Sequence, residues 1–156
     1  MTRSVFAAPA LAMALALSPV PAAAGEVAEG LVRMPSAHSV ETTLDRLARL
    51  LKDKGLTVFT RVNHAANAAG AGLEMRDAQV LIFGNPKLGT PLMKAAPTAA
   101  IDLPQKALAY EDDAGRVWLA YTDPEYLAAR HGITGRDAVL DRIAKALDTF
   151  ATKATQ

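Results

Sequence analysis

Residues 80–86 read Val-Leu-Ile-Phe-Gly-Asn-Pro, and this stretch decides the fold. Four consecutive apolar residues that stop at turn residues are typical of a buried strand. Asn85 is a favourable residue at the start of a helix, and Pro86 suits the first helical position. The stretch therefore predicts a buried strand that leads directly into a short helix.

The pair Thr90-Pro91 repeats this helix-start pattern five residues later, so the sequence predicts a second short helix there. An alternative interpretation is that the free backbone N–H groups at such helix starts bind an anion. Gly84 and Gly89 alone do not make a nucleotide-binding loop.

Periodic patterns predict the remaining elements. Apolar residues recur at helical spacing in residues 40–51 and 139–150, with Ser39 and Thr134 as the expected N-caps. Residues 56–63 alternate with period two, which puts Val58 and Thr60 on one face and Phe59 and Arg61 on the other. Further strands are expected at residues 31–34, 106–111 and 117–122, and short helices at residues 64–71 and 124–130.

The predicted order is strand, helix, four strands, helix. Long helices beside an antiparallel meander imply an α+β domain of two layers, with both main helices on one face of the sheet. We expect a lead-in and first strand in residues 25–35, the rest of this single domain in residues 36–151, and a tail in residues 152–156.

Residues 1–24 are predicted to be a secretory signal peptide. Arg3 is the one charged side chain before Glu26, and the apolar segment 5–17 is followed by small residues at 22–24. This order is typical of an export signal, and the apolar segment is short for a membrane span. The alternative is an anchor that is not removed. We therefore expect a periplasmic or secreted protein with no membrane contact after cleavage.

Composition excludes several functions. Removal of residues 1–24 leaves 132 residues, the size of one domain, with 16 basic and 16 acidic side chains. A net charge near zero gives no attraction to nucleic acid. The chain has no cysteine, which excludes thiol catalysis and thiolate metal sites. His38, His64 and His131 form no HxxxH or HxH pair, so no local metal site is encoded.

Five short motifs follow one another in the chain. They are Phe-Thr-Arg-Val-Asn-His at 59–64, Ala-Ala-Gly at 68–70, Phe-Gly-Asn-Pro at 83–86, Asp-Leu-Pro at 102–104 and Tyr-Glu-Asp at 110–112. In this order they resemble the bacterial domain-of-unknown-function family 302, over residues 39–131. The resemblance implies a saddle fold like that of the TATA-binding protein and no established activity. The family usually has an acidic residue where this chain has Asn63, which argues against an acid–histidine dyad of neighbouring residues.

His64 is the first candidate for a functional residue because it follows a predicted strand, where side chains project from a rigid scaffold. A neutral imidazole can act as a general base or bind a metal or haem. The alternative is a hydrogen-bonded histidine that closes the turn into the next helix. Asp102 could direct its carboxylate toward His64, or it could cap a backbone turn.

The other ligand-binding candidates are Asn85, Tyr110, Trp118 and Tyr121. Asn85 lies at the possible anion site described above. Tyr110 and Tyr121 either line a pocket or pack with their hydroxyl groups hydrogen-bonded. Trp118 points to the face opposite Tyr121, where an exposed aromatic ring would indicate a ligand or partner.

Three functions fit these observations. The first is a noncatalytic protein that holds a small ligand, haem or a metal between the sheet and the helices after Pro86. The second is a small acid–base enzyme that uses His64 with Asp102 or Tyr110. The third is a homodimeric scaffold or stress-response subunit joined through sheet edges or faces. The sequence names no cofactor, and the lack of a nucleophile motif favours binding over catalysis.

Overall fold

The computed structural model of the protein describes residues 28–156, and the predicted signal peptide lies outside this range. The elements, in chain order, are β1 (Leu31–Pro35), α1 (Val40–Asp53), β2 (Thr57–Asn63), α2 (His64–Gly70), β3 (Ala78–Gly84), α3 (Pro86–Ala95), the 3-10 helix η1 (Pro97–Ile101), β4 (Gln105–Glu111), β5 (Val117–Thr122), α4 (Pro124–His131) and α5 (Asp137–Thr155).

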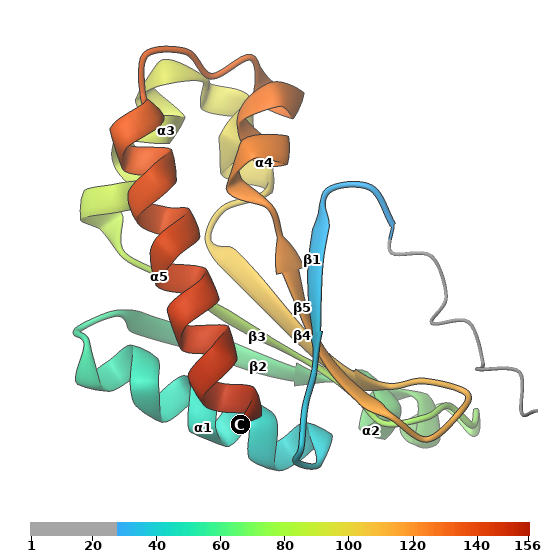
Figure 1. Cartoon of the computed structure of the whole chain (residues 1–156). Helices are drawn as coiled ribbons and strands as arrows, with labels where there is room; N and C mark the ends of the chain where they lie inside the picture. The colour runs from blue at the N-terminus through green and yellow to red at the C-terminus, as the bar shows by residue number, and fades with distance from the viewer. Residues whose placement is uncertain (1–27) are drawn as a thin grey trace, which may run out of the picture.

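The five strands form one antiparallel sheet in the order β1-β5-β4-β3-β2. Helices α1 and α5 cover one face of this sheet, and α3, η1 and α4 gather at one end of it (Figure 1). The predicted α+β class, with two main helices on one face of an antiparallel sheet, is confirmed.

The core lies between the sheet and the two long helices. Strand β3 alternates in burial, so that Leu81 and Phe83 point toward the helices while Val80 and Ile82 point to the other face. Each helix contributes one apolar stripe at the expected spacing, and these stripes are Val40, Leu44, Leu47 and Leu51 on α1 and Leu140, Ile143, Leu147 and Phe150 on α5.

Helix α1 begins as predicted, because Oγ of Ser39 accepts a hydrogen bond from the N–H of Thr42 at 3.2 Å. The prediction for α5 is wrong at its start. The helix begins at Asp137, and no side chain caps it. Gly135 has a φ of +65°, which is a left-handed conformation, so the helix cannot extend back through this glycine to Thr134.

Residues 152–155, which the sequence analysis assigns to a tail, belong to helix α5. Helix α5 continues to Thr155, and both Ala154 and Thr155 are buried. Arg46 of α1 holds this end of the helix by donating hydrogen bonds of 3.0 and 2.9 Å to the carbonyl groups of Ala154 and Lys153. The guanidinium thus satisfies carbonyl groups that a helix end leaves without intrahelical partners.

Thr90-Pro91 does not begin a second helix. Asn85 caps α3 and Pro86 begins it as predicted, but Pro91 then lies inside the same helix. A proline within a helix removes one backbone hydrogen bond and favours a kink, and here the helix continues past it. One ten-residue helix therefore replaces the two short ones expected from the sequence.

The predicted alternation of β2 fails after Val58. Val58 pairs with Phe83, but the next pair is Thr60 with Ile82, so Phe59 is the extra residue of a β-bulge. Arg61 therefore pairs with Leu81 and lies on the helix-covered face, where it donates a hydrogen bond of 2.9 Å to the carbonyl of Glu41. A bulge of one residue exchanges the two faces of the strand beyond it.

Candidate functional site

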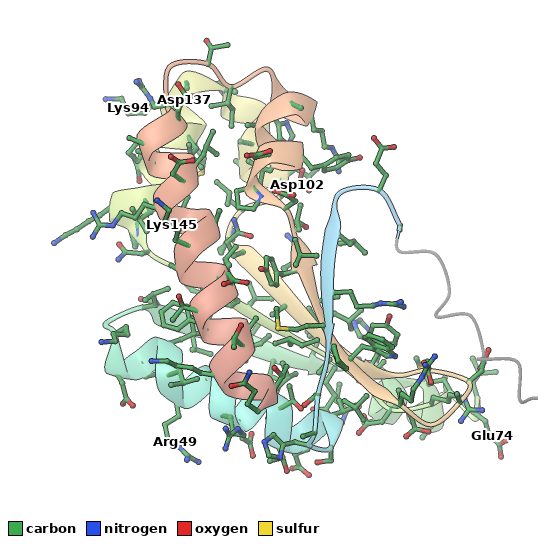
Figure 2. All side chains as sticks on the ribbon, viewed as in Figure 1. Arg49, Glu74, Lys94, Asp102, Asp137 and Lys145 are labelled. Carbon is green, nitrogen blue, oxygen red and sulfur yellow. The ribbon has the colours of Figure 1, made fainter. Side chains whose placement is uncertain are left out.

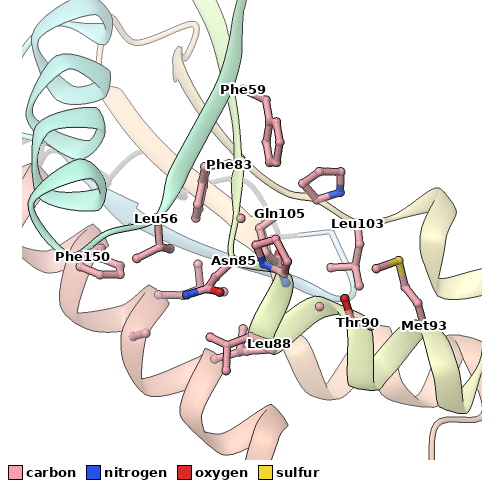
Figure 3. Close-up of a pocket in the computed structure, with 17 residues that line it drawn as sticks. Leu56, Phe59, Phe83, Asn85, Leu88, Thr90, Met93, Leu103, Gln105 and Phe150 are labelled. Carbon is pink, nitrogen blue, oxygen red and sulfur yellow. The ribbon is translucent and has the colours of Figure 1, made fainter.

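A cavity of about 200 Å³ lies at the end of the sheet where β3 leads into α3. Figure 3 shows its lining, which comes from the ends of β2 and β3, from α3, from the segment before β4, and from α5. Its walls are mainly apolar and include Phe83, Leu88, Met93, Leu103 and Phe150. Protein interiors contain few voids of this size, so this cavity is the first candidate for a ligand site.

The Phe-Gly-Asn-Pro motif at residues 83–86 forms part of this cavity. Strand β3 ends at Gly84, and Oδ1 of Asn85 then accepts a hydrogen bond of 2.9 Å from the N–H of Lys87. The chain therefore leaves the sheet at once as a helix. A Cβ atom at Gly84 would be in ordinary van der Waals contact with the Cβ of Pro104 and the ring of Phe59.

Small residues keep space open on the other walls. Gly89 of α3 and Ala146 of α5 both line the cavity, with no side chain at one and a single methyl group at the other. Because these positions lie on two different helices, the space between α3 and α5 is not filled by large side chains from both sides.

Gln105 is the most buried polar residue of the cavity lining, with 8% of its surface exposed. It is the first residue of β4 and lies on the helix-covered face of the sheet, in line with buried Ala107 and Ala109. Within residues 28–156, its side-chain amide makes no hydrogen bond. It is not among the fully buried unpaired groups of these residues, so it keeps contact with the solvent of the cavity. Sequence reasoning missed this residue, although a polar side chain among core-facing alanines was a readable signal.

Of the six predicted site residues, Asn85 lines this cavity and the other five do not. His64 is exposed at the start of α2, and no hydrogen bond joins it to Asp102 or Tyr110. Asp102 precedes β4, whereas Asn63, the neighbour of His64, pairs with Gln79 opposite Ala109 near the other end of β4. His64 and Asp102 are therefore separated by about 20 Å along the sheet.

Asp102 contacts a different histidine. Its Oδ2 lies 2.7 Å from Nε2 of His131, and Nδ1 of this ring lies 3.1 Å from Oγ1 of Thr98. Nη1 of Arg130 is 3.4 Å from the same carboxylate oxygen (Figure 2 labels Asp102 beside α4). The group joins η1 to the end of α4. A hydroxyl, an imidazole and a carboxylate in series also occur at nucleophilic sites, but none of these three residues lines the cavity.

Tyr110 and Trp118 pair with each other on the face of the sheet away from α1 and α5. Trp118 is on the face expected for it, but it is not an exposed aromatic, since 9% of its surface is accessible. The guanidinium of Arg33 covers the indole at 4.0 Å from its centroid, and Nη1 of Arg33 donates a hydrogen bond of 3.2 Å to the hydroxyl of Tyr110. These contacts stabilise the β1–β5–β4 surface.

The carboxylate of Asp112 completes this cluster. Nε1 of Trp118 donates a hydrogen bond of 2.8 Å to Oδ2 of Asp112, and the backbone N–H of Arg116 bonds its Oδ1 at 2.9 Å. These hydrogen bonds lower the pKa of Asp112 to about 2. Tyr121 lies on the helix-covered face within the core, and its burial raises its pKa to about 12.

The family model for DUF302, a domain of unknown function, matches residues 32–150. The chain therefore belongs to the DUF302 family. The fold is similar to that of an uncharacterised conserved DUF302 protein from Bacillus stearothermophilus, with a TM-score of 0.72 and 18% identity over 81% of this chain and 99% of that one. At this identity the likeness supports the fold alone.

Two curated relatives are named as fluoride-specific ion channels. FluC 1 of Brucella suis is 47% identical over 113 residues, which are 72% of this chain and 44% of the relative. FluC 1 of Brucella abortus is 47% identical over the same share of this chain and 42% of the relative. The chain thus spans less than half the length of these relatives. Among residues 28–156, no helix is both long and apolar enough to cross a membrane.

Proposed function

We propose that this protein binds a small organic ligand in the α3 cavity and does not catalyse a reaction on it. The observation that carries the proposal is the apolar cavity of about 200 Å³ between α3, α5 and the end of the sheet. Apolar cavities in otherwise close-packed proteins bind small apolar molecules. The volume is below the usual range for drug-sized ligands, so the ligand is small.

The residue types that line the cavity indicate which class of ligand it can bind. It contains no histidine, aspartate, glutamate or cysteine, and Met93 is the one residue of it with a side chain that commonly ligates haem iron or copper. This composition supports an organic ligand over the haem or metal that the sequence left open. It also supports binding over acid–base catalysis, because no titratable side chain lines the cavity.

The test is a titration of the ¹⁵N-labelled full chain with benzene and indole, followed by NMR. We expect saturable shifts at the backbone amides of Gly89, Gln105 and Ala146. The variant Ala146→Leu fills the cavity from α5 and is expected to abolish these shifts. The matched control is Ala69→Leu, which makes the same change at an exposed position of α2.

Native mass spectrometry of the protein purified from the cells that make it extends the test to a retained natural ligand. A bound mass that disappears in Ala146→Leu and persists in Ala69→Leu supports the proposal. A ligand-free mass, together with no saturable shift for either probe, contradicts it. The same spectra report any dimer, and a chain that begins at Gly25 supports the proposed export to the periplasm.

A second candidate function is an accessory role beside a fluoride channel. It is favoured by the 47% identity to relatives that are named as fluoride-specific ion channels and of which this chain matches 42–44%. The test is the fluoride sensitivity of cells that lack this protein. Greater sensitivity that the restored wild-type chain reverses supports this role, and unchanged sensitivity counts against it.

A further inference from the structure

The unpaired amide of Gln105 indicates which chemical group the ligand carries. An amide side chain has two donor hydrogens and a carbonyl acceptor. Gln105 is 92% buried at the cavity wall, and within residues 28–156 neither end of its amide has a hydrogen-bond partner. The amide is not among the fully buried unpaired groups of these residues, so it keeps contact with the solvent of the cavity. A ligand in the cavity would remove that solvent, and a ligand without a polar group beside Gln105 would leave the amide without any partner.

A second buried glutamine on the same face of the sheet differs from Gln105 in its hydrogen bonding. Gln79 of β3 is 7% exposed, and its Nε2 donates a hydrogen bond of 3.1 Å to Oδ1 of Asp77. Gln79 does not line the cavity. Of these two similarly buried glutamines, the one away from the cavity has a partner for its amide and the one beside the cavity has none.

The charge of the lining restricts the ligand further. None of its seventeen residues is Asp, Glu, Lys, Arg or His, so a charged ligand would be desolvated without an opposite charge to pair with. Lys106, the charged residue next to Gln105 in sequence, points to the other face of the sheet and donates a hydrogen bond of 2.9 Å to the carbonyl of Asp102. A neutral ligand avoids this penalty.

We propose that the ligand is a small neutral molecule with an apolar body and a head group that both donates and accepts hydrogen bonds, such as a primary amide, with the head paired to the Gln105 amide. The apolar body lies against Leu88, Met93 and Leu103. Asn85 stands beside the same space, and its Nδ2 is a further donor because its Oδ1 already caps α3. This inference rests on the proposed function, because it specifies the ligand of the same cavity.

The experiment compares three probes with the same six-carbon body on the unaltered full chain: hexanamide, hexanoate and hexylammonium, with benzene as the apolar reference. Affinities are measured by NMR titration at pH 7. We expect hexanamide to bind at least tenfold more tightly than either ion. Since a buried hydrogen bond to a neutral group contributes about one power of ten in affinity, Gln105→Met is expected to weaken hexanamide binding about tenfold and to leave benzene binding unchanged.

Gln79→Met is the matched control and is expected to leave hexanamide affinity unchanged. If benzene binds but hexanoate binds as tightly as hexanamide, or Gln105→Met keeps the full hexanamide affinity, the assigned head group is wrong and the cavity proposal stands. If neither benzene nor hexanamide binds, both proposals fail. The comparison of head groups uses the wild-type chain, so it remains decisive even if Gln105→Met does not fold.

Discussion

The carboxylate of Asp102 and the imidazole of His131 are joined at 2.7 Å, although 29 residues separate them in the chain. Only 6% of the His131 side chain is exposed, and the pair connects η1, which packs on α3, with α4. This contact, together with those of Thr98 with His131 and of Arg130 with Asp102, therefore fixes η1 against α4.

The first prediction concerns this pair. His131→Ala is expected to lower the free energy of unfolding by about 1.5–3 kcal/mol, because it leaves a partly buried carboxylate without this hydrogen bond. A double-mutant cycle with Asp102→Asn, measured by urea unfolding, should give a coupling of about 0.5–3 kcal/mol. His64→Ala is the control and should change stability by less than about 0.5 kcal/mol, because His64 is exposed. Equal losses of stability in His131→Ala and His64→Ala would refute the conclusion that the contact of His131 with Asp102 stabilises the fold.

The second prediction concerns Gly30. It has a φ of +78°, and a Cβ atom there would overlap the ring of Tyr126. Gly55 has a similar φ of +74° with open space around it. Gly55→Ala is expected to cost about 1–2 kcal/mol from backbone strain alone, and Gly30→Ala about 1–3 kcal/mol more from the steric overlap. Thermal unfolding measures the stability of both variants. Similar losses of stability would show that the ring of Tyr126 moves away from the new Cβ atom at little cost.

The third prediction is a pH dependence of stability that comes from Asp112. The folded-state pKa of about 2 is below the ordinary value of 3.8, so the unfolded chain binds the proton more readily between these values. The stabilisation is thus present above about pH 4 and is lost as the pH falls to about 2. Asp112→Asn should be less stable than the wild type at pH 7, and this difference should shrink over that range.

The control for this experiment is Asp113→Asn, because Asp113 is fully exposed in the same turn and makes no contact with Trp118. Urea unfolding at pH 7, 4, 3 and 2 is the measurement. A difference between Asp112→Asn and the wild type that stays constant down to pH 2 would contradict the prediction.

The fourth prediction tests the starts of the two long helices. Ser39→Ala removes the cap of α1 and is expected to cost about 1 kcal/mol. Thr134→Ala should change the free energy of unfolding by less than about 0.5 kcal/mol, because α5 begins at Asp137 without a side-chain cap. A larger loss at Thr134 than at Ser39 would place the start of α5 nearer to the sequence-based expectation.

Local patterns in the sequence were enough to predict the class of fold and the order of its elements. The helical spacing in α1 and α5, the apolar run in β3 and the hairpin turn before β5 each depend on neighbouring residues. The bulge at Phe59 carries no comparable signal, because the period-two pattern of β2 continues through it. The faces of β2 beyond the bulge were therefore assigned the wrong way round.

The candidate site could be predicted only in outline. The sequence indicated the space after Pro86 and included Asn85, but the cavity depends on how far α3 and α5 stand apart, which is a tertiary property. The sequence left open whether Asp102 caps a backbone turn or directs its carboxylate toward His64. Its carboxylate contacts His131 instead, because η1 and α4 lie together at the opposite end of the sheet. Gln105 had a signal in the sequence as a polar residue among core-facing alanines, but its place at the cavity wall depends on the same tertiary packing.

The contacts of Arg46 with the last turn of α5 have a consequence for the order of events during synthesis. Helix α1 packs on the sheet and on α5, and it receives this second partner only when the nineteen-residue helix α5, which follows all five strands, has been made. A nascent chain that lacks this segment has an apolar stripe on α1 with part of its cover missing. The domain therefore cannot close until α5 has been made, which leaves its earlier elements open to chaperones until then.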